Sequence, residues 1–255
     1  MAKVKLKRKR KRRPHGIKRW RKLSTTKALG VFEKNMGDFD RLMQLHAEIA
    51  GSGPGRKYNV AVLHKSAILL LFASWESYCE DAVSELHERV TAQVGSPREM
   101  PTAMKQYILR SITDNTKNEL AFWELLGDAW RSKLKKVLRN TEEQRNRSFN
   151  TPRAGIVDKH FEESLGIKNL SSTWHWQGMN KDQAAKKLSA FIELRGSIAH
   201  RLGEARVIHR NTVVGYGAFV RQLVSLTDGF LVARYNSRGF VRREVRANSA
   251  SVSVE

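Results

Sequence analysis

The sequence predicts an all-α protein, and three observations support this fold class. Apolar residues recur every three to four positions in several long segments, as on one face of a helix. No stretch in the middle of the chain alternates between apolar and polar residues as a half-buried strand would. With 255 residues, 40% of them hydrophobic, the chain can form a sizeable core. We expect one helical domain of residues 25–236, a disordered basic arm of residues 1–24 and a frayed tail of residues 237–255.

Two long helices are expected in the first half of the chain. The first follows Thr25 or Thr26, either of which could cap its start, and ends at the turn residues 51–55. Its apolar face contains Leu29, Phe32, Met36, Phe39, Met43 and Ile49. The second runs from about residue 59 to 94 and is apolar almost all round in its first half, which is typical of a central core helix. We expect Cys79, within this helix, to be buried packing.

The second half of the chain predicts shorter helices. Pro97 and Pro101 interrupt the chain, and residues 140–155 form a polar segment that we expect to be an exposed loop. The expected helices lie at about residues 102–113, 118–139, 156–165, 181–200 and 212–235. The stripe of the helix at 181–200 contains Ala185, Leu188, Phe191, Ile192, Arg195 and Ala199. An aromatic triplet at 174–176 is more typical of a cover for the core than of a surface that stacks bases.

The charge is high and unevenly placed. The net charge is +22, and residues 3–22 hold 13 Lys or Arg and no acidic residue, which leaves about +9 on the rest of the chain. This balance favours a polyanionic partner, with nucleic acid first and an anionic membrane surface second. We expect the arm to contact RNA phosphates, although a solvated tail or a nuclear localisation signal would look the same. The predicted RNA-binding residues are Lys7, Arg8, Lys9, Arg10, Lys11, Arg12, Arg13, Arg19 and Arg21.

Several classes of protein are disfavoured by missing sequence features. One cysteine excludes an internal disulfide and suits a reducing cytosol. No secretory signal is visible, and the longest apolar run, residues 67–73, is too short to span a membrane. The chain contains no P-loop and no HExxH motif, and its histidines are scattered. We therefore expect a cytoplasmic protein with no metal, no cofactor and no membrane partner.

The segment "IELRGSIAHR" carries the strongest candidate chemistry. RNA can be cleaved without a metal when the 2′-OH attacks the adjacent phosphorus, one group transfers protons and another stabilises the phosphoryl oxygens. His200 suits the first task because an unperturbed histidine titrates near neutral pH, and Arg195 suits the second as a permanent donor fork. Five residues of an ideal helix turn through about 500°, so these side chains diverge by about 140°. They converge only if the helix ends near His200 or if a partner subunit completes the site.

Three stretches, in this order, resemble the RiboL-PSP-HEPN group of the HEPN superfamily. They are "LLLFASWESYCEDAVSEL" (69–86), "FEESLGIKNLSSTWHWQG" (161–178) and "AAKKLSAFIELRGSIAHR" (184–201), and with flanking helices the resemblance covers about residues 27–235. It implies an up-and-down helical bundle with extra helices that acts as a metal-independent endoribonuclease, usually a homodimer. The expected product ends are a 2′,3′-cyclic phosphate and a 5′-hydroxyl. Such enzymes are often toxins or phage-defence effectors, with an antitoxin or regulatory partner.

The resemblance also assigns candidate site residues. It implies that His200 transfers protons, that Arg195 contacts the phosphate and that Glu76 helps to orient the site, with Ser197 and Arg201 as further lining residues. Active members of the group commonly carry a polar residue directly after the motif arginine, where this chain has Gly196. Besides the enzyme, two alternatives stay open. The second is an inactive HEPN fold that binds RNA or a protein partner, and the third is a DNA-associated accessory protein.

Overall fold

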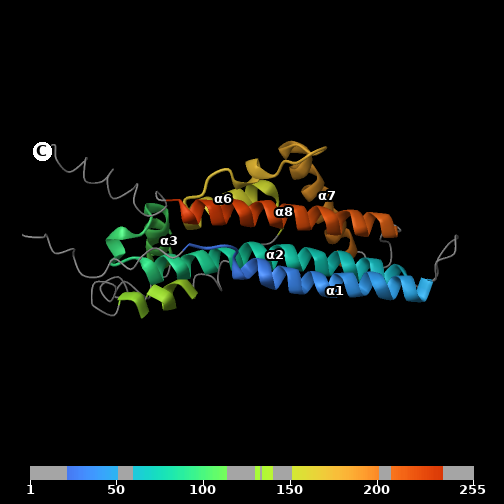
Figure 1. Cartoon of the computed structure of the whole chain (residues 1–255), viewed down its shortest axis with the longest axis horizontal. Coiled ribbons are helices and arrows are strands. Elements are labelled where there is room, and N and C mark those ends of the chain that lie inside the picture. Colours follow the sequence, from blue (N-terminus) through green and yellow to red (C-terminus); the bar gives the residue numbers. More distant parts are fainter. Residues whose placement is uncertain are drawn as a thin grey trace, which may run out of the picture.

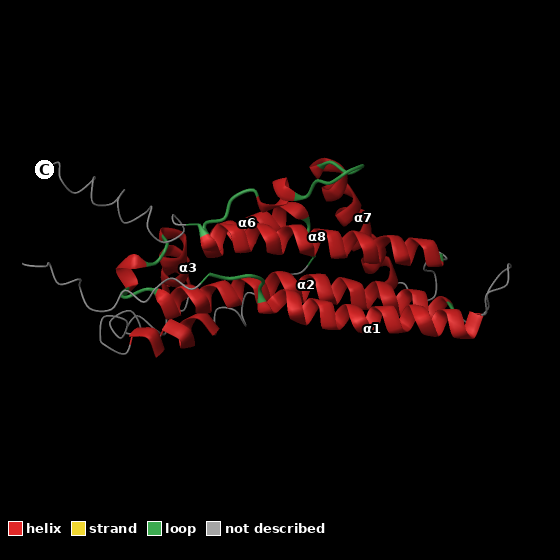
Figure 2. Cartoon of the chain, in the orientation of Figure 1, coloured by secondary structure: helices red, strands yellow, loops and turns green. Residues whose placement is uncertain are grey.

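The computed structural model describes residues 22–50, 60–113, 130–132, 134–139, 151–200 and 208–237. Within these ranges the protein is built from helices, and the only pairing of extended backbone is an isolated bridge between Trp176 and Met179 (Figure 2). The predicted all-α fold is confirmed. None of the helices in these ranges is long and apolar enough to cross a membrane.

Three long helices lie side by side along the molecule (Figure 1): α1 (Lys27–Ala50), α2 (Ala61–Gln93) and α8 (Arg210–Asn236). The start of α1 lies beside the end of α8, because Leu23 is hydrogen-bonded to Asn236. Farther along, a Cβ atom on Gly217 of α8 would come within 2.7 Å of the Phe39 ring of α1. The α1–α8 crossing is therefore closest where glycine provides room, and the two helices run in opposite directions.

Shorter elements complete the bundle: η1 (Pro97–Glu99), α3 (Thr102–Thr113), α6 (Ala154–Leu165), η2 (Leu170–Thr173) and α7 (Lys181–His200). The sequence placed most of these helices within two residues of their observed ends, and residues 130–132 and 134–139 of a further predicted helix are also helical. α6 stops at Gly166, whose φ of 70° is easily adopted by glycine. α7 runs steeply across the long axis of the three long helices and packs on α2 (Figure 1).

Helix α2 forms the centre of the core. It buries one wide face along its length, which includes Ile68, Trp75, Cys79 and Leu86, each with 0% exposure, whereas Val62 on the opposite side is 63% exposed. This confirms the prediction of a central helix with an inert buried thiol. Trp174, with 0% exposure, packs its ring against that of Trp75 at a centroid distance of 5.8 Å, whereas His175 is exposed. The aromatic triplet therefore covers the core through Trp174.

Two apolar stripes differ in detail from their predictions. Ile49 is 62% exposed, although it was expected on the buried face of α1. Six residues separate it from Met43, and six residues turn an α-helix through about 600°, so Ile49 points about 120° away from the stripe. On α7 the buried positions are Ala184 and Ile198 rather than the predicted Ala185 and Ala199, which lie one residue farther along the helix.

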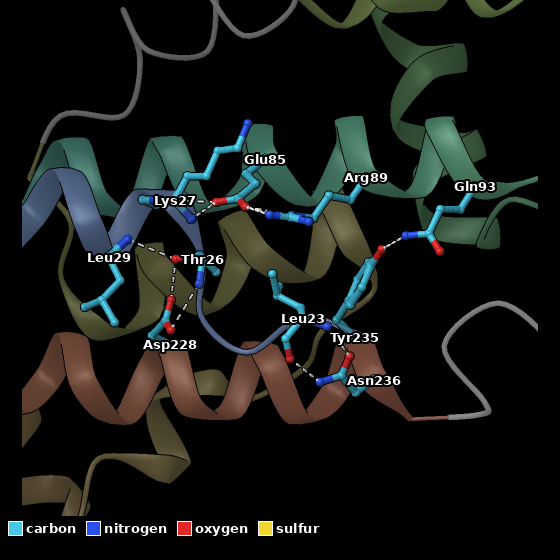
Figure 3. Close-up of polar contacts among 11 residues, drawn as sticks. Leu23, Thr26, Lys27, Leu29, Glu85, Arg89, Gln93, Asp228, Tyr235 and Asn236 are labelled. Carbon is cyan, nitrogen blue, oxygen red and sulfur yellow. Dashed lines mark hydrogen bonds and ion pairs between the residues drawn. The ribbon is translucent and has the colours of Figure 1, made fainter. Parts of the chain in front are cut away.

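Polar side chains fasten the start of α1 to α2 and α8 (Figure 3). The Thr26 hydroxyl accepts the N–H of Leu29 at 2.9 Å, which makes Thr26 the cap that the sequence predicted, and it donates to the buried carboxylate of Asp228. Glu85 of α2 accepts the N–H groups of Lys27 and Ala28. A carboxylate therefore lies at the N-terminus of α1, where the helix dipole favours a negative charge.

Candidate active site

One face of α2 presents the first half of the candidate site. Phe72 and Glu76 are four residues apart on this helix and therefore share a face, with Phe72 buried and Glu76 half-buried. α7 packs against this face, and the guanidinium carbon of Arg195 lies 4.5 Å from the centroid of the Phe72 ring. The planar guanidinium gains a cation–π contact there while it remains half-buried. Arg195 is thus held on a fixed apolar support.

The same face brings Glu76 close to Arg195. Burial raises the pKa of the Glu76 carboxyl, whereas the nearby Arg195 guanidinium and a hydrogen bond from the Thr151 backbone N–H lower it. Glu76 and Arg195, 119 positions apart in the chain, are therefore close enough for their charges to interact. A carboxylate near an arginine draws the guanidinium toward it through charge.

A turn of residues 151–153 closes this part of the site, and the sequence did not predict its role. The Trp75 Nε1–H donates to the Pro152 carbonyl oxygen at 3.3 Å, and the Arg153 N–H donates to the Thr151 carbonyl oxygen at 2.7 Å. Pro152 is buried, so the prediction that this segment belongs to an exposed loop is wrong at its end. Composition alone could not reveal the contact, because these residues are polar or turn-forming in any context.

The end of α7 carries the rest of the sequence motif. α7 ends at His200, one of the two conditions under which Arg195 and His200 could serve one site, and the side chain of His200 lies outside the described part of the structure. Ser197 is exposed, and its hydroxyl donates to the Leu194 carbonyl oxygen of its own helix. It therefore does not take part in the Glu76–Arg195 contact. A Cβ atom added to Gly196 would meet no atom within 4 Å.

Aromatic rings form the wall behind Arg195. Phe72 and Phe191 lie 6.2 Å apart between ring centroids, and Phe191 and Tyr216 of α8 lie 4.9 Å apart. Burial raises the pKa of the Tyr216 hydroxyl, and the charge of Glu193 raises it further. Tyr216 therefore stays neutral at physiological pH and can serve the site only as a hydroxyl.

A shallow groove of about 360 Å³ lies between the start of α6 and α7. Its lining residues are Arg153, Ala154, Gly155, Ala185, Lys186, Ser189, Ala190 and Glu193. Arg153 spans it toward Glu193 at 3.6 Å, with both side chains well exposed. Because Arg153 also belongs to the turn at 151–153, the groove adjoins the Glu76 side of the candidate site.

The remaining predicted residues fall in other parts of the chain. The nine cationic residues predicted to bind RNA, together with Arg201, lie outside the described residues. Within the ranges that the structure describes, no three His, Cys, Asp or Glu side chains gather as the ligands of a metal ion would. The described part of the candidate site therefore consists of Arg195, Glu76 and the residues that contact them.

A family model described as RiboL-PSP-HEPN matches residues 38–233. The match includes α2, α7 and nearly all of α8, and with them Glu76, Arg195 and His200. No curated protein and no solved structure was found to match the chain.

Proposed function

The chain belongs to the RiboL-PSP-HEPN family, and we propose that it is an endoribonuclease that cleaves RNA without a metal. One observation carries the proposal: α2 and α7 place the Glu76 carboxylate beside a guanidinium that is stacked on Phe72. An arginine held in this way presents N–H groups in a fixed direction, which is what stabilisation of a phosphoryl oxygen requires.

In the proposed reaction the 2′-OH of the substrate attacks the adjacent phosphorus. His200 takes the proton from the 2′-OH and later supplies one to the leaving 5′-oxygen, and Arg195 stabilises the charge on the phosphoryl oxygens. The products are a 2′,3′-cyclic phosphate and a 5′-hydroxyl. Glu76 acts through Arg195, because its negative charge keeps the guanidinium oriented and ionised groups in a half-buried site need a counter-charge.

A homodimer is part of the proposal. On a continuous helix the directions of residues 195 and 200 differ by about 140°, so one α7 presents them on different sides. Two copies packed near the ends of α7 would bring Arg195 of one copy toward His200 of the other. Because α7 ends at His200, the alternative is that Arg195 and His200 of one chain form the site together.

We further propose that the arm supplies most of the affinity for RNA. The described residues contain 23 Lys or Arg against 16 Asp or Glu, so the bundle itself is only moderately basic. By contrast, residues 3–22 contain 13 cations and no acid. Cations bind RNA mainly by releasing counterions, so affinity from the arm falls steeply with salt. Free cleavage of cellular RNA would harm the host, which fits a toxin or phage-defence effector controlled by a regulatory partner.

The competing function is an inactive scaffold that binds RNA or a partner, and Gly196 favours it because it removes a polar group next to Arg195. Two variants separate the proposals. For an enzyme, Arg195→Ala abolishes cleavage while RNA binding by the full chain stays close to wild type. For a scaffold, neither the wild type nor Arg195→Ala cuts RNA, and deletion of residues 1–22 removes the binding that both of them retain. Gel-shift binding and cleavage of total tRNA, measured on the same preparations, distinguish the outcomes.

A further inference from the structure

The turn of residues 151–153 has an unfavourable backbone that its neighbours must hold. Thr151 has a φ of 65°, in the left-handed region that a β-branched residue rarely adopts. The hydrogen bond from the Arg153 N–H back to the Thr151 carbonyl closes a turn of only three residues. Such conformations persist where surrounding contacts impose them, and they concentrate at functional sites.

Three of the contacts that the turn makes bear on this conformation. The ion pair between Arg153 and Glu193 is exposed and 3.6 Å long, so it contributes little. The other two contacts come from neighbouring residues of α2: the buried Trp75 indole N–H donates to the Pro152 carbonyl, and the Glu76 carboxylate accepts the Thr151 N–H. Consecutive residues of one helix therefore bind consecutive residues of the turn.

We propose that Trp75 is a positioning residue, which holds the turn of residues 151–153 so that its Thr151 N–H fixes the Glu76 carboxylate against Arg195. The indole touches neither Arg195 nor the substrate in this account. It acts through the turn on Glu76, and Glu76 acts on Arg195. The catalytic consequence rests on the proposed function, whereas the effect on Glu76 itself does not.

Trp174 provides a matched control. Both indoles have 0% exposure, their rings contact each other, and each N–H makes one hydrogen bond, at 3.3 Å for Trp75 and at 2.9 Å to the Thr227 hydroxyl for Trp174. Trp75→Phe and Trp174→Phe therefore remove similar buried volume and one buried hydrogen bond each. Only the bond of Trp75 leads to the turn beside Glu76.

The first test measures Glu76 directly and needs no cleavage. In protein labelled with ¹³C at glutamate carboxyls, the Glu76 signal is assigned by its loss in Glu76→Gln and is titrated by NMR. Loss of the Thr151 N–H removes one of the two interactions that lower the pKa of Glu76, so Trp75→Phe should raise this pKa and Trp174→Phe should leave it unchanged. If Trp75→Phe and Trp174→Phe change the pKa of Glu76 equally, or if neither changes it, the proposal is overturned. Thr151→Gly, which keeps the N–H and readily adopts the φ, should also leave this pKa near wild type.

The second test is a double-mutant cycle on RNA cleavage. Trp75→Phe should lower kcat by about tenfold with little change in KM, because a misplaced charged group costs rate more than binding. In a Glu76→Gln background it should cost nothing further, since the residue through which it acts is already gone. Additive losses would mean that Trp75 only stabilises the fold and would overturn the proposal. If no variant and no wild type cuts RNA while the NMR result holds, the proposed function fails and the positioning role stands.

Discussion

The guanidinium carbon of Arg195 lies 4.5 Å from the centroid of the Phe72 ring, and Glu76 follows Phe72 by one turn of the same helix. α2 thus supplies both an apolar surface for the flat face of the cation and a charge for its edge. The two groups act on the guanidinium in different ways, because the ring packs against it and the carboxylate attracts its charge. The arginine of the motif is therefore preorganised before any substrate binds.

Phe72→Leu should lower kcat/KM by about tenfold, because the variant keeps an apolar side chain and loses the aromatic face under Arg195. Phe32→Leu is the control: Phe32 is also buried and contacts Tyr78 edge-on at a centroid distance of 6.0 Å, but no described contact joins it to Arg195. Steady-state cleavage and urea unfolding of both variants test this. Equal activity losses at equal losses of stability would mean that the ring acts through packing alone.

Gly196→Asn should raise cleavage activity. A Cβ atom at this position meets no atom within 4 Å, so the larger residue fits without displacing α7. It would restore the polar group that active members of the resembling group commonly carry after the motif arginine. Replacement of a helical glycine should at the same time leave stability unchanged or slightly higher. Cleavage rates of Gly196→Asn and Gly196→Ala separate the effect of the polar group from the effect of replacing glycine. A higher cleavage rate in Gly196→Ala but not in Gly196→Asn would contradict the prediction.

Asp228→Ala should lower the free energy of unfolding by about 2–3 kcal/mol, because two buried hydroxyls and a buried N–H lose their acceptor. The Asp228 carboxylate is 3% exposed and accepts the Thr26 N–H, the Thr26 hydroxyl and the Tyr78 hydroxyl. Asp40→Ala is the matched variant, since Asp40 binds Arg221 at 2.7 Å on the surface and should cost less than about 1 kcal/mol. Urea denaturation measures both, and similar losses would contradict the role of Asp228 at the start of α1.

Stability should fall as the pH falls below about 6.5. Burial lowers the pKa of His64, and the charges of His46, His209 and Arg210 lower it further against the hydrogen bond to the Ile208 carbonyl. Below the usual pKa of 6.5 the unfolded chain binds a proton that the folded chain resists, so stability is lost as the pH falls from about 6.5 to the lowered folded pKa and then levels off. Urea unfolding between pH 5 and 8 should show a weaker pH dependence for His64→Gln than for wild type. If His64→Gln shows the same pH dependence of the free energy of unfolding as wild type, groups other than His64 cause it.

The elements that the sequence located best are those with long apolar repeats. α7 was placed at Lys181–His200 because its stripe is regular, whereas Ile49 was misplaced because the step from Met43 is not a multiple of the helical period. The proximity of Glu76 and Arg195 was implied only by the family resemblance, since no local pattern joins positions so far apart. The turn at 151–153 left no signal, because neither a positive φ at threonine nor the carbonyl that accepts the Trp75 indole N–H can be read from composition.

If Arg195 and His200 cleave RNA without a metal, the ends of the RNA products carry the signature of that reaction. Wild type and His200→Ala, both purified in the same way, are incubated with total tRNA in EDTA. The account predicts that wild type leaves 2′,3′-cyclic phosphate and 5′-hydroxyl ends and that His200→Ala leaves the RNA intact while still binding it. Equal cleavage by both proteins, or 3′-hydroxyl and 5′-phosphate ends, would contradict the account.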